Sequence, residues 1–283
     1  MKYYALYNPL AANGAAKTDA FKVRDLMVGD TIDFVDMTKI TSYEELFGEM
    51  EKDSAIIICG GDGTLNRFVN DISELPDKDI LYYACGTGND FLVDIGGKKG
   101  DKPIKINEYL CDLPTVTVKG KTYKFINGIG YGIDGYCCEV GDKYKEKSNK
   151  PANYTAIAIK GLLFHYKPTN AKVTVDGQEY NYKKTWLVPT MNGRMYGGGM
   201  IPTPDQNRLG DGSLSTMIYS NAGKIAALTL FPKIFEGKHI ENKKVVEVKK
   251  GRYIKVEFDR PVALQIDGET VLSVTEYECR AGK

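Results

Sequence analysis

Apolar and polar residues alternate along the first third of the chain in two rhythms, one typical of strands and one typical of helices. The runs that predict strands are residues 3–7, 31–35, 55–59 and 80–84. The segments that predict helices are residues 15–28, 41–50 and 65–72. The third strand is apolar without interruption, which is typical of a strand buried on both faces. This order of elements predicts parallel strands joined by crossover helices, an open α/β sheet.

From about residue 113 the pattern changes to short segments that often alternate polar with apolar residues. The expected strands are residues 114–118, 122–126, 171–175, 179–182, 185–189, 213–218, 245–248, 253–258 and 262–266. Asp176-Gly177 between two of them is a typical two-residue hairpin loop. Two helices are expected among these strands, at residues 151–165 with Asn149 as the cap and at residues 222–235. Regular short strands separated by turn residues predict a β-sandwich.

The predicted fold class is therefore α/β, with an N-terminal open α/β domain at residues 1–112 and a C-terminal β-sandwich domain at residues 113–272. A length of 283 residues agrees with two domains. The content of 42% hydrophobic and 27% charged residues is typical of a globular protein and excludes a disordered one.

Charge and cysteine usage exclude several classes of function. Lys and Arg number 38 against 37 Asp and Glu, so no nucleic-acid partner is expected. The six cysteines form no C-x-x-C pair and only two histidines accompany them, which argues against a zinc site. No signal peptide is recognisable, and no apolar run approaches about 18 residues. We therefore expect a cytoplasmic protein without a transmembrane segment, whose contact with membranes is peripheral.

The most informative stretch is Gly-Gly-Asp-Gly-Thr at residues 60–64, which joins an apolar strand to a helical segment. Its glycines allow a ligand to approach the backbone, and the N–H groups of a helix start favour an anion. Thr64 is the expected N-cap of the helix at residues 65–72. Asp62 would repel a phosphate unless it binds a metal or orients a donor, which suggests magnesium-dependent phosphate chemistry.

A second glycine turn, Gly-Thr-Gly-Asn-Asp-Phe at residues 86–91, follows the next predicted strand, and Asn8 ends the first strand. The carboxyl ends of parallel strands share one edge of a sheet, where ligands bind. We therefore expect these three turns to form one site. Thr87 and Asn89 offer neutral hydrogen-bonding groups there, although an Asx turn with a helix cap explains Asn89 equally well.

Two further carboxylate segments lie late in the chain. Gly-Asp-Gly-Ser around Asp211 suits a metal loop completed by backbone carbonyls, or a plain turn. Asp267-Gly268-Glu269 places two carboxylates two residues apart at a strand end. One of them would be disfavoured as an anion and act as a proton acceptor, or the pair Asp-Gly is simply a hairpin turn.

In this order the segments resemble the diacylglycerol kinase catalytic-domain family, which includes bacterial soluble lipid kinases and is related to sphingosine and ceramide kinases. The segments are residues 60–66, 86–91, 197–199, 211–214 and 267–269. The first is shared with NAD kinases and phosphofructokinases, and the second and last select the lipid-kinase branch. The resemblance implies an NAD-kinase-like nucleotide domain and a β-sandwich with the active site between them, and residues 273–283 returning to the first domain.

The resemblance also implies transfer of the γ-phosphoryl group of ATP, with Mg²⁺, to a hydroxyl of diacylglycerol or a related lipid at the membrane surface, and a homodimer is possible. The implied and candidate ATP-binding residues are Asn8, Pro9, Leu10, Thr38, Gly60, Gly61, Asp62, Gly63, Thr64, Leu65, Asn66, Arg67, Thr87 and Asn89. Asp211 would hold the metal with the backbone carbonyls of Arg208 and Ser213. Asp267 and Glu269 stand at the proton-acceptor position, and Asp62 would contact the metal or its waters.

Two other functions fit part of the pattern. A kinase for a soluble acceptor such as NAD explains the first glycine turn but not the late Asp-Gly-Glu. A non-catalytic regulator that binds nucleotide or lipid has no physical need for so many carboxylates, which are costly to bury. The chain departs from the family pattern at Arg67, at Leu92-Val93 and at Gln206, where relatives often have glutamate, a small-then-basic pair and alanine.

Overall fold

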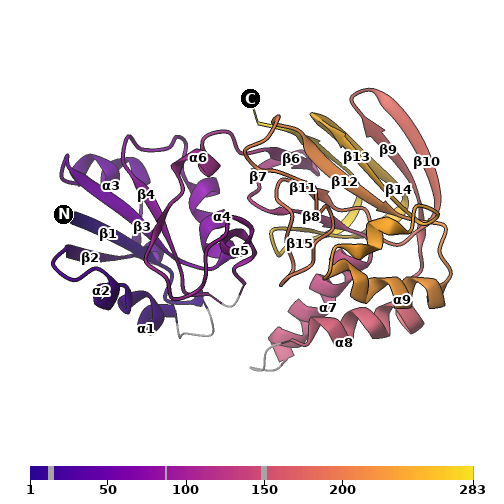
Figure 1. Cartoon of the computed structure of the whole chain (residues 1–283), viewed down its shortest axis with the longest axis horizontal. Coiled ribbons are helices and arrows are strands. Elements are labelled where there is room, and N and C mark those ends of the chain that lie inside the picture. The colour runs from indigo at the N-terminus through magenta and orange to yellow at the C-terminus, as the bar shows by residue number, and fades with distance from the viewer. Residues whose placement is uncertain (12–15, 87, 148–151, 283) are drawn as a thin grey trace. The chain divides into compact units, whose positions relative to one another are not determined.

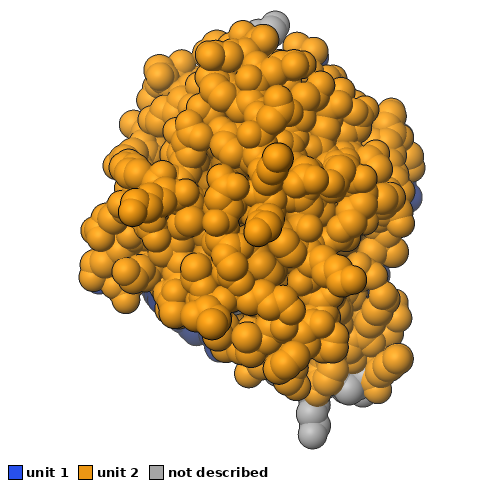
Figure 2. Space-filling view, turned by 90° about the vertical axis from the view of Figure 1, so that its right-hand side faces the viewer, with its two compact units in different colours: residues 1–113 blue, residues 114–283 orange. Residues whose placement is uncertain are grey.

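A computed structural model describes residues 1–11, 16–86, 88–147 and 152–282 of the chain. Two sequence predictions, the ATP-binding residue Thr87 and the helix cap Asn149, lie outside these residues. The chain forms two compact units, Met1–Leu113 and Pro114–Lys283, which are coloured separately in Figure 2. Each unit has its own sheet and its own core.

The first unit contains a five-stranded sheet in the order β2-β1-β3-β4-β5. Its strands are β1 (Lys2–Tyr7), β2 (Thr31–Asp36), β3 (Ser54–Gly60), β4 (Ile80–Ala84) and β5 (Ile104–Lys105). The first four pair in parallel, and β5 pairs antiparallel to β4. The predicted open α/β sheet is confirmed, and β3 is buried along its whole length as expected.

Helices pack on both faces of this sheet (Figure 1). They are α1 (Ala16–Phe21), α2 (Val23–Leu26), α3 (Tyr43–Glu49), α4 (Asp62–Asp71), α5 (Asp90–Asp94) and α6 (Asn107–Leu110). On one face Ala20 and Val23 join a core with Ile57 of β3. On the other, the ring of Phe91 lies 5.6 Å from that of Tyr82 in β4. The side chains of a strand alternate between faces, so apolar β3 and β4 serve both layers.

The start of α4 differs from the prediction. The helix begins at Asp62 with Gly61 at its N-cap, so the expectation that Thr64 caps it is wrong. Thr64 is the third helical residue, and its side chain fills the space beside Gly60, where a Cβ atom would lie 2.3 Å from the Thr64 Cβ. The helix N-terminus therefore follows directly after β3, at the carboxyl end of the parallel strands.

The second unit contains a ten-stranded sheet in which eight strands follow the order β13-β12-β11-β8-β14-β15-β6-β7, and β9 pairs with both β10 and β14. The strands are β6 (Thr115–Val118), β7 (Lys121–Lys124), β8 (Gly128–Tyr131), β9 (Thr169–Val175), β10 (Gln178–Thr185), β11 (Thr190–Met191), β12 (Leu214–Tyr219), β13 (Val246–Gly251), β14 (Tyr253–Ile266) and β15 (Glu269–Arg280). The predicted hairpin at Asp176-Gly177 joins β9 to β10.

One long strand, β14, organises this unit. Its first half pairs with β9 and its last residues pair with β8, while β15 runs along the other edge. The register with β15 shifts between Glu257 and Val262, where Pro261 cannot donate a ladder hydrogen bond. A bulged strand of this kind can pass from one layer of a sandwich to the other.

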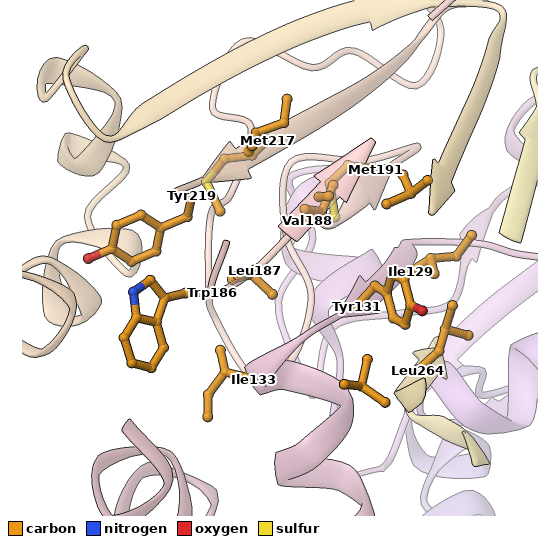
Figure 3. Close-up of a cluster of buried hydrophobic side chains, with 14 of the residues drawn as sticks. Ile129, Tyr131, Ile133, Trp186, Leu187, Val188, Met191, Met217, Tyr219 and Leu264 are labelled. Atoms are coloured by element: carbon orange, nitrogen blue, oxygen red, sulfur yellow. The ribbon is translucent and has the colours of Figure 1, made fainter. Parts of the chain in front are cut away.

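The core of the second unit lies between its strands and three helices, α7 (Ile133–Lys147), α8 (Tyr154–Lys160) and α9 (Lys224–Ile234). A π-helical turn at Gly161–His165 continues α8, and 3-10 turns occur at Met37–Lys39 and Lys238–Glu241. Figure 3 shows part of this core around the single tryptophan, Trp186. Its indole Nε1 donates to the carbonyl oxygen of Ala222 at 2.8 Å, so the buried ring leaves no polar atom unpaired.

Several predictions for the second unit need correction. Helix α7 was not expected, and neither was β8. Of residues 185–189, Thr185 ends β10 and the others form only isolated bridges at Leu187. The two strands predicted at 253–258 and 262–266 are one. β15 pairs with β14 and β6, so residues 273–280 belong to the second unit and do not return to the first. No helix in the described part of the chain is long and apolar enough to cross a membrane.

Candidate functional site

The two glycine turns of the first unit pack directly against each other. A Cβ atom on Gly61 would lie 2.6 Å from the carbonyl oxygen of Gly88, and one on Gly86 would lie 2.5 Å from the Cα of Gly61. Backbone hydrogen bonds join the turns as well, from the Asp62 N–H to the Gly88 oxygen and from the Cys85 N–H to the Gly60 oxygen. The glycines at 60, 61 and 86 are thus required by the fold itself, which the sequence could not show.

Asp62 links the two turns through its side chain. Its carboxylate accepts the N–H of Asp90 at 2.7 Å and that of Phe91 at 3.1 Å, the first two residues of α5. A carboxylate at a helix N-terminus is stabilised both by these bonds and by the helix dipole. Asp62 itself is buried, with 9% of its surface exposed. Of the two roles considered for this residue, the structure shows one directly: Asp62 binds backbone donors.

Gly63 differs from its neighbours because no contact in the fold explains it. A Cβ atom at this position would meet nothing within 4 Å, and its φ is not positive. Nearby, the Asn89 side chain donates to the Gly86 oxygen at 3.0 Å, while its own Oδ1 is buried without a hydrogen-bond partner among the described residues. Gly63 is exposed, so the start of α4 is open to solvent beside this buried acceptor.

The remaining ATP-binding candidates divide into exposed and buried residues. Asn8 follows β1, and its Oδ1 accepts the Leu10 N–H at 3.0 Å in an Asx turn that also contains Pro9. Thr38 donates its hydroxyl and its N–H to Asp36 Oδ1, at 2.7 and 2.9 Å. Asn8 and Thr38 thus follow β1 and β2, at the same edge of the sheet as α4.

The last three candidates lie on α4 and differ in their burial and contacts. Leu65 is fully buried and belongs to the core, which removes it from direct contact with a ligand. Asn66 is buried as well, and its oxygens accept the side-chain N–H group of Asn70. Arg67 is exposed, and its Nε lies 3.2 Å from Asp71 Oδ2 one turn along the helix.

Sequence reasoning missed Lys99 as a site residue. Its ammonium group donates to the Gly86 carbonyl oxygen at 2.9 Å, which places a cation at the second glycine turn. The sequence shows Lys98, Lys99 and Lys102 only as a cluster of exposed charges. A cation thirteen residues away from Gly86 in the sequence can be assigned to the site only when the fold shows the two in contact.

In the second unit, Asp267-Gly268 is the two-residue loop of the β14–β15 hairpin, with φ of 47° and 96°. The Asp267 carboxylate accepts three backbone N–H groups, from Ile126 at 2.5 Å, Asn127 at 2.8 Å and Gly128 at 2.9 Å. These three donors fix the position of the carboxylate. Glu269, the other proton-acceptor candidate, begins β15 and is exposed.

Gln265 links the same hairpin to Asp134 of α7 through hydrogen bonds. Gln265 Oε1 accepts the Gly268 N–H at 2.6 Å, and its Nε2 donates to Asp134 Oδ2 at 3.0 Å. Desolvation raises the pKa of Asp134 to about 6, against the opposing effect of the Gln265 bond. Gly130 makes room for this carboxylate, because a Cβ atom there would overlap Asp134 Oδ2. Neither residue stood out in the sequence.

The loop around Asp211 is an Asx turn that precedes β12. Asp211 Oδ1 accepts the Ser213 N–H at 3.0 Å and the Ser213 hydroxyl at 2.5 Å. The Ser213 hydroxyl hydrogen bond is the main cause that holds the pKa of Asp211 below its usual value. No group of three or more His, Cys, Asp or Glu side chains suited to a metal occurs among the described residues. A metal here would depend on Asp211, backbone carbonyls and water.

Gln206 and Arg208 connect this loop to the Asp267 hairpin. Buried Gln206 donates to the carbonyl oxygens of Ser213 at 2.8 Å and Asn192 at 3.3 Å. The Asn192 side chain in turn donates to the Ile126 oxygen at 3.0 Å, and Arg208 Nη1 donates to the same oxygen at 2.5 Å. The two late carboxylate segments, which lie more than fifty residues apart in the sequence, therefore belong to one hydrogen-bonded cluster.

Comparison with known proteins agrees with this architecture. Residues 2–119 match the diacylglycerol kinase catalytic domain, and residues 127–279 match the YegS C-terminal NAD kinase beta sandwich-like domain. Together they define a two-domain phosphotransferase that acts on an alcohol group. The chain belongs to the diacylglycerol kinase catalytic-domain family.

Individual relatives carry the same name. A diacylglycerol kinase of Bacillus subtilis is 27% identical over 76% of this chain and 70% of its own length. One of Mycobacterium tuberculosis is 26% identical over 85% of this chain and 80% of its own. A solved diacylglycerol kinase structure from Bacillus anthracis shares the fold, with a TM-score of 0.60 at 20% identity over 99% of this chain and 94% of that one. The homologues support a lipid kinase.

Proposed function

We propose that the chain transfers the γ-phosphoryl group of ATP to a hydroxyl of diacylglycerol or a closely related lipid, in a reaction that requires Mg²⁺. The membership in a lipid-kinase family supports the reaction class. The named relatives support diacylglycerol as the first acceptor to test.

The observation that carries the nucleotide half of the proposal is the open space at Gly63. A glycine inside a helix costs about 0.5–1 kcal/mol relative to alanine. Neither packing nor backbone conformation requires it here, because a Cβ atom would stand free. A phosphate group held by the N–H groups at the start of α4 would occupy this space. Gly63 is then explained by close approach of the nucleotide.

Each of the other groups has a proposed role in the same reaction. Asp62 holds the two glycine turns in place, and Lys99 adds a positive charge. The Asp267-Gly268-Glu269 hairpin supplies the proton acceptor for the lipid hydroxyl. Phosphoryl transfer depends mainly on position and charge stabilisation, so the cradle should matter more to the rate than the strength of the base.

The proposed Mg²⁺ ligands are Asp211 and the backbone carbonyls of Arg208 and Ser213. These are hard oxygen donors, which suit Mg²⁺. The bond from Gln206 fixes the Ser213 carbonyl and leaves its second lone pair for a ligand. When bound, the ion would lower the cost of the negative charge that gathers at the reacting phosphate. Mg²⁺ should raise the melting temperature of the wild-type protein but not of Asp211→Ala, and equal shifts would refute this site.

The reaction is tested with radiolabelled ATP and a panel of detergent-dispersed lipids that contains diacylglycerol, sphingosine and ceramide, with NAD as the soluble acceptor. We expect label in phosphatidic acid. Label in NAD alone would overturn the proposal, and so would ATP binding without transfer to any acceptor.

The nucleotide cradle has a matched test in two glycine substitutions. Gly63→Ala should raise the KM for ATP about tenfold, roughly 1.4 kcal/mol of lost binding, because the added methyl group fills the ligand space. Gly48→Ala in α3 is the control, since its Cβ also meets nothing within 4 Å. Both variants should be slightly more stable than wild type. An unchanged KM for Gly63→Ala would remove the main support for the cradle.

A further inference from the structure

Helix α7 packs directly on the hairpin that carries Asp267-Gly268-Glu269. A Cβ atom on Gly135 would overlap the backbone of Ala263 in β14, so only glycine lets the helix lie this close to the strand. Gln265 of β14 and Thr270 of β15 form the second pair of the ladder, counted from the loop. The side chains of such a pair lie on the same face of a sheet, so both can reach the same helix.

Each strand of the hairpin is joined to α7 by a hydrogen bond to a carboxylate. On β14, Gln265 Nε2 donates to Asp134 Oδ2 at 3.0 Å. On β15, the Thr270 hydroxyl donates to Asp142 Oδ2 at 2.6 Å. Positions 134 and 142 are two turns apart on one side of the helix, about 12 Å along its axis. The helix therefore holds the hairpin at both strands.

Asp134 also determines which way the Gln265 amide faces. Gln265 is 3% exposed, and its Oε1 accepts the Gly268 N–H at 2.6 Å while its Nε2 points away from the loop. Asp134 is the acceptor for that Nε2 group. Without this acceptor a buried N–H group is unsatisfied, and the amide can turn and direct an N–H group at the Gly268 N–H. Asp134 thus holds the hairpin loop through Gln265.

The β9–β10 hairpin shows that an Asp-Gly turn forms without such bonds to a helix. Its loop, Asp176-Gly177, has φ of 47° and 86°, close to the values in the β14–β15 loop. The corresponding ladder pair is Thr174 and Glu179, and Glu179 forms an exposed ion pair with Lys172 of β9. Among the described residues, neither member of this pair forms a hydrogen bond to a helix. The bonds to α7 therefore serve the position of the β14–β15 hairpin rather than its formation.

We propose that α7 positions the β14–β15 hairpin for catalysis, with Asp134 and Asp142 as positioning residues that act through Gln265 and Thr270. A reacting group displaced by about 1 Å can lose about 100-fold in rate, so a hairpin that carries a proton acceptor needs to be held in place. The inference rests on the proposed function, in which this hairpin supplies the proton acceptor. It adds the residues that fix that acceptor in position.

Thr270→Val is the first test, because valine keeps the branched shape of threonine and removes only the hydroxyl donor. The Asp142 side chain is 43% exposed and lies 3.5 Å from the Lys145 ammonium group, so water can replace the lost bond and the unit should stay folded. With a short-chain diacylglycerol dissolved as monomers, kcat should fall about tenfold while the KM for ATP stays within about twofold. Thr270→Ser keeps the donor, and its kcat should stay within about twofold of wild type.

Thr174→Val is the matched control. It makes the same change in the corresponding ladder pair of the β9–β10 hairpin, so kcat and both KM values should equal those of wild type. Fluorescence of Trp186 during urea unfolding reports that each variant is folded under the conditions of the assay. A loss of kcat in Thr174→Val or Thr270→Ser equal to that in Thr270→Val would overturn the positioning role.

A double-mutant cycle tests whether Asp142 and Thr270 act as a pair. Asp142→Ala should lower kcat by the same factor as Thr270→Val, and the two changes together should lower it no further. Independent losses of about tenfold each, and about 100-fold together, would refute the pair.

The pair of Asp134 and Gln265 has its own test. Asp134→Ala should lower kcat about tenfold, whereas Asp134→Asn keeps an oxygen that accepts the Gln265 Nε2 group and should keep most of the activity. Equal losses of kcat in the two Asp134 variants would refute a role through Gln265.

Hydrogen exchange of residues 266–270 measures motion of the hairpin without any substrate. Thr270→Val should speed exchange there and leave the β9–β10 hairpin unchanged. Exchange equal to that of wild type overturns the positioning role, whatever the activity, and so does faster exchange with an unchanged kcat. Faster exchange in a protein that phosphorylates no acceptor supports the restraint of the hairpin by α7 and refutes the proposed function.

Discussion

Removal of the Asp62 carboxylate should destabilise the first unit far more than removal of an exposed carboxylate from the same helix. Asp62 is buried and accepts two backbone N–H groups at the start of α5. That helix has only five residues, so it cannot form without such support. Hydrogen bonds to a charged group contribute about 1.5–3 kcal/mol each. With part of this recovered by water, we expect Asp62→Ala to lower the free energy of unfolding by about 3 kcal/mol.

Two further variants show whether the hydrogen bonds are the cause. Asp62→Asn keeps the shape but turns an amide N–H group toward one of the two donors, so it should lose at least half of the same free energy. Asp71→Ala in the last turn of α4 removes a carboxylate that forms an exposed ion pair with Arg67. Pairs of this kind contribute at most about 0.5 kcal/mol. Asp71→Ala is therefore the control for loss of a negative charge from α4.

The assay is urea unfolding followed by two probes, with hydrogen exchange to locate the effect. The only tryptophan is Trp186 in the second unit, so its fluorescence reports that unit, whereas far-ultraviolet circular dichroism reports both. Asp62→Ala should shift the dichroism transition and speed exchange in residues 88–95. If Asp62→Ala and Asp71→Ala unfold at the same urea concentration, the structural role is refuted. Loss of turnover without loss of stability would instead support the role of Asp62 as a contact to the metal.

Three other outcomes follow from the site. Desolvation raises the pKa of Asp134 from 3.8 to about 6, so its contribution to stability is full below 3.8 and is lost as the pH rises through 6. Asp134→Asn should remove up to about 3 kcal/mol of that decline, measured as urea midpoints across this range, and an unchanged slope would contradict it. Lys99→Met should raise the KM for ATP several-fold with little change in kcat, and a wild-type KM would exclude Lys99 from the phosphates. Asp267→Asn should lower both stability and turnover, whereas Glu269→Gln should leave stability unchanged because Glu269 is exposed; the variant with the larger loss of kcat identifies the proton acceptor.

Elements that depend on local pattern could be predicted from the sequence. The strands β1 to β4 were found from their apolar residues, most clearly β3, because a strand buried on both faces needs an unbroken apolar run. Ser42 caps α3 at the start of the helix predicted at residues 41–50. Helix α7 was missed because Gly135 lies in its first turn and three glycines at 128, 130 and 132 precede it, which normally argues against a helix. The structure explains this glycine by packing: a Cβ atom on Gly135 would overlap the backbone of Ala263 in β14.

Site residues were predictable where they lie in turns and not where their partners are distant. Five glycines at 60, 61, 63, 86 and 88 mark the two turns in the sequence, and packing requires three of them. Gly61 and Gly86 are required because the two turns touch, and Gly60 is required because the Thr64 side chain fills the space beside it. The partners of Asp62 lie 28 and 29 residues away, so its role depends on which strands are neighbours. The same holds for Gln206, whose three partners in the Asp211 loop and beside it become visible only in the folded unit.

The two Asp-Gly hairpins of the second unit show why a turn alone cannot identify a catalytic residue. Asp176 and Asp267 both have φ of 47° and are both followed by a glycine with positive φ. Both carboxylates also bind the backbone of a neighbouring segment, Asp176 through the N–H groups of Arg252 and Tyr253 and Asp267 through three others. Asp176 and Asp267 therefore share a structural role, which is to bind the backbone of a neighbouring segment.

What distinguishes Asp267 is its surroundings. Of the two hairpins, only that of Asp267 forms a hydrogen bond with Gln265. It is also connected to Arg208 through the backbone of Ile126. If that cluster serves catalysis, Asp176→Asn and Asp267→Asn should cost similar stability, about 1–3 kcal/mol, since each leaves backbone donors without their carboxylate. Only Asp267→Asn should also reduce turnover of soluble, short-chain acceptor. Equal activity in the two variants would mean that the Asp267 carboxylate has only the structural role that Asp176 also has.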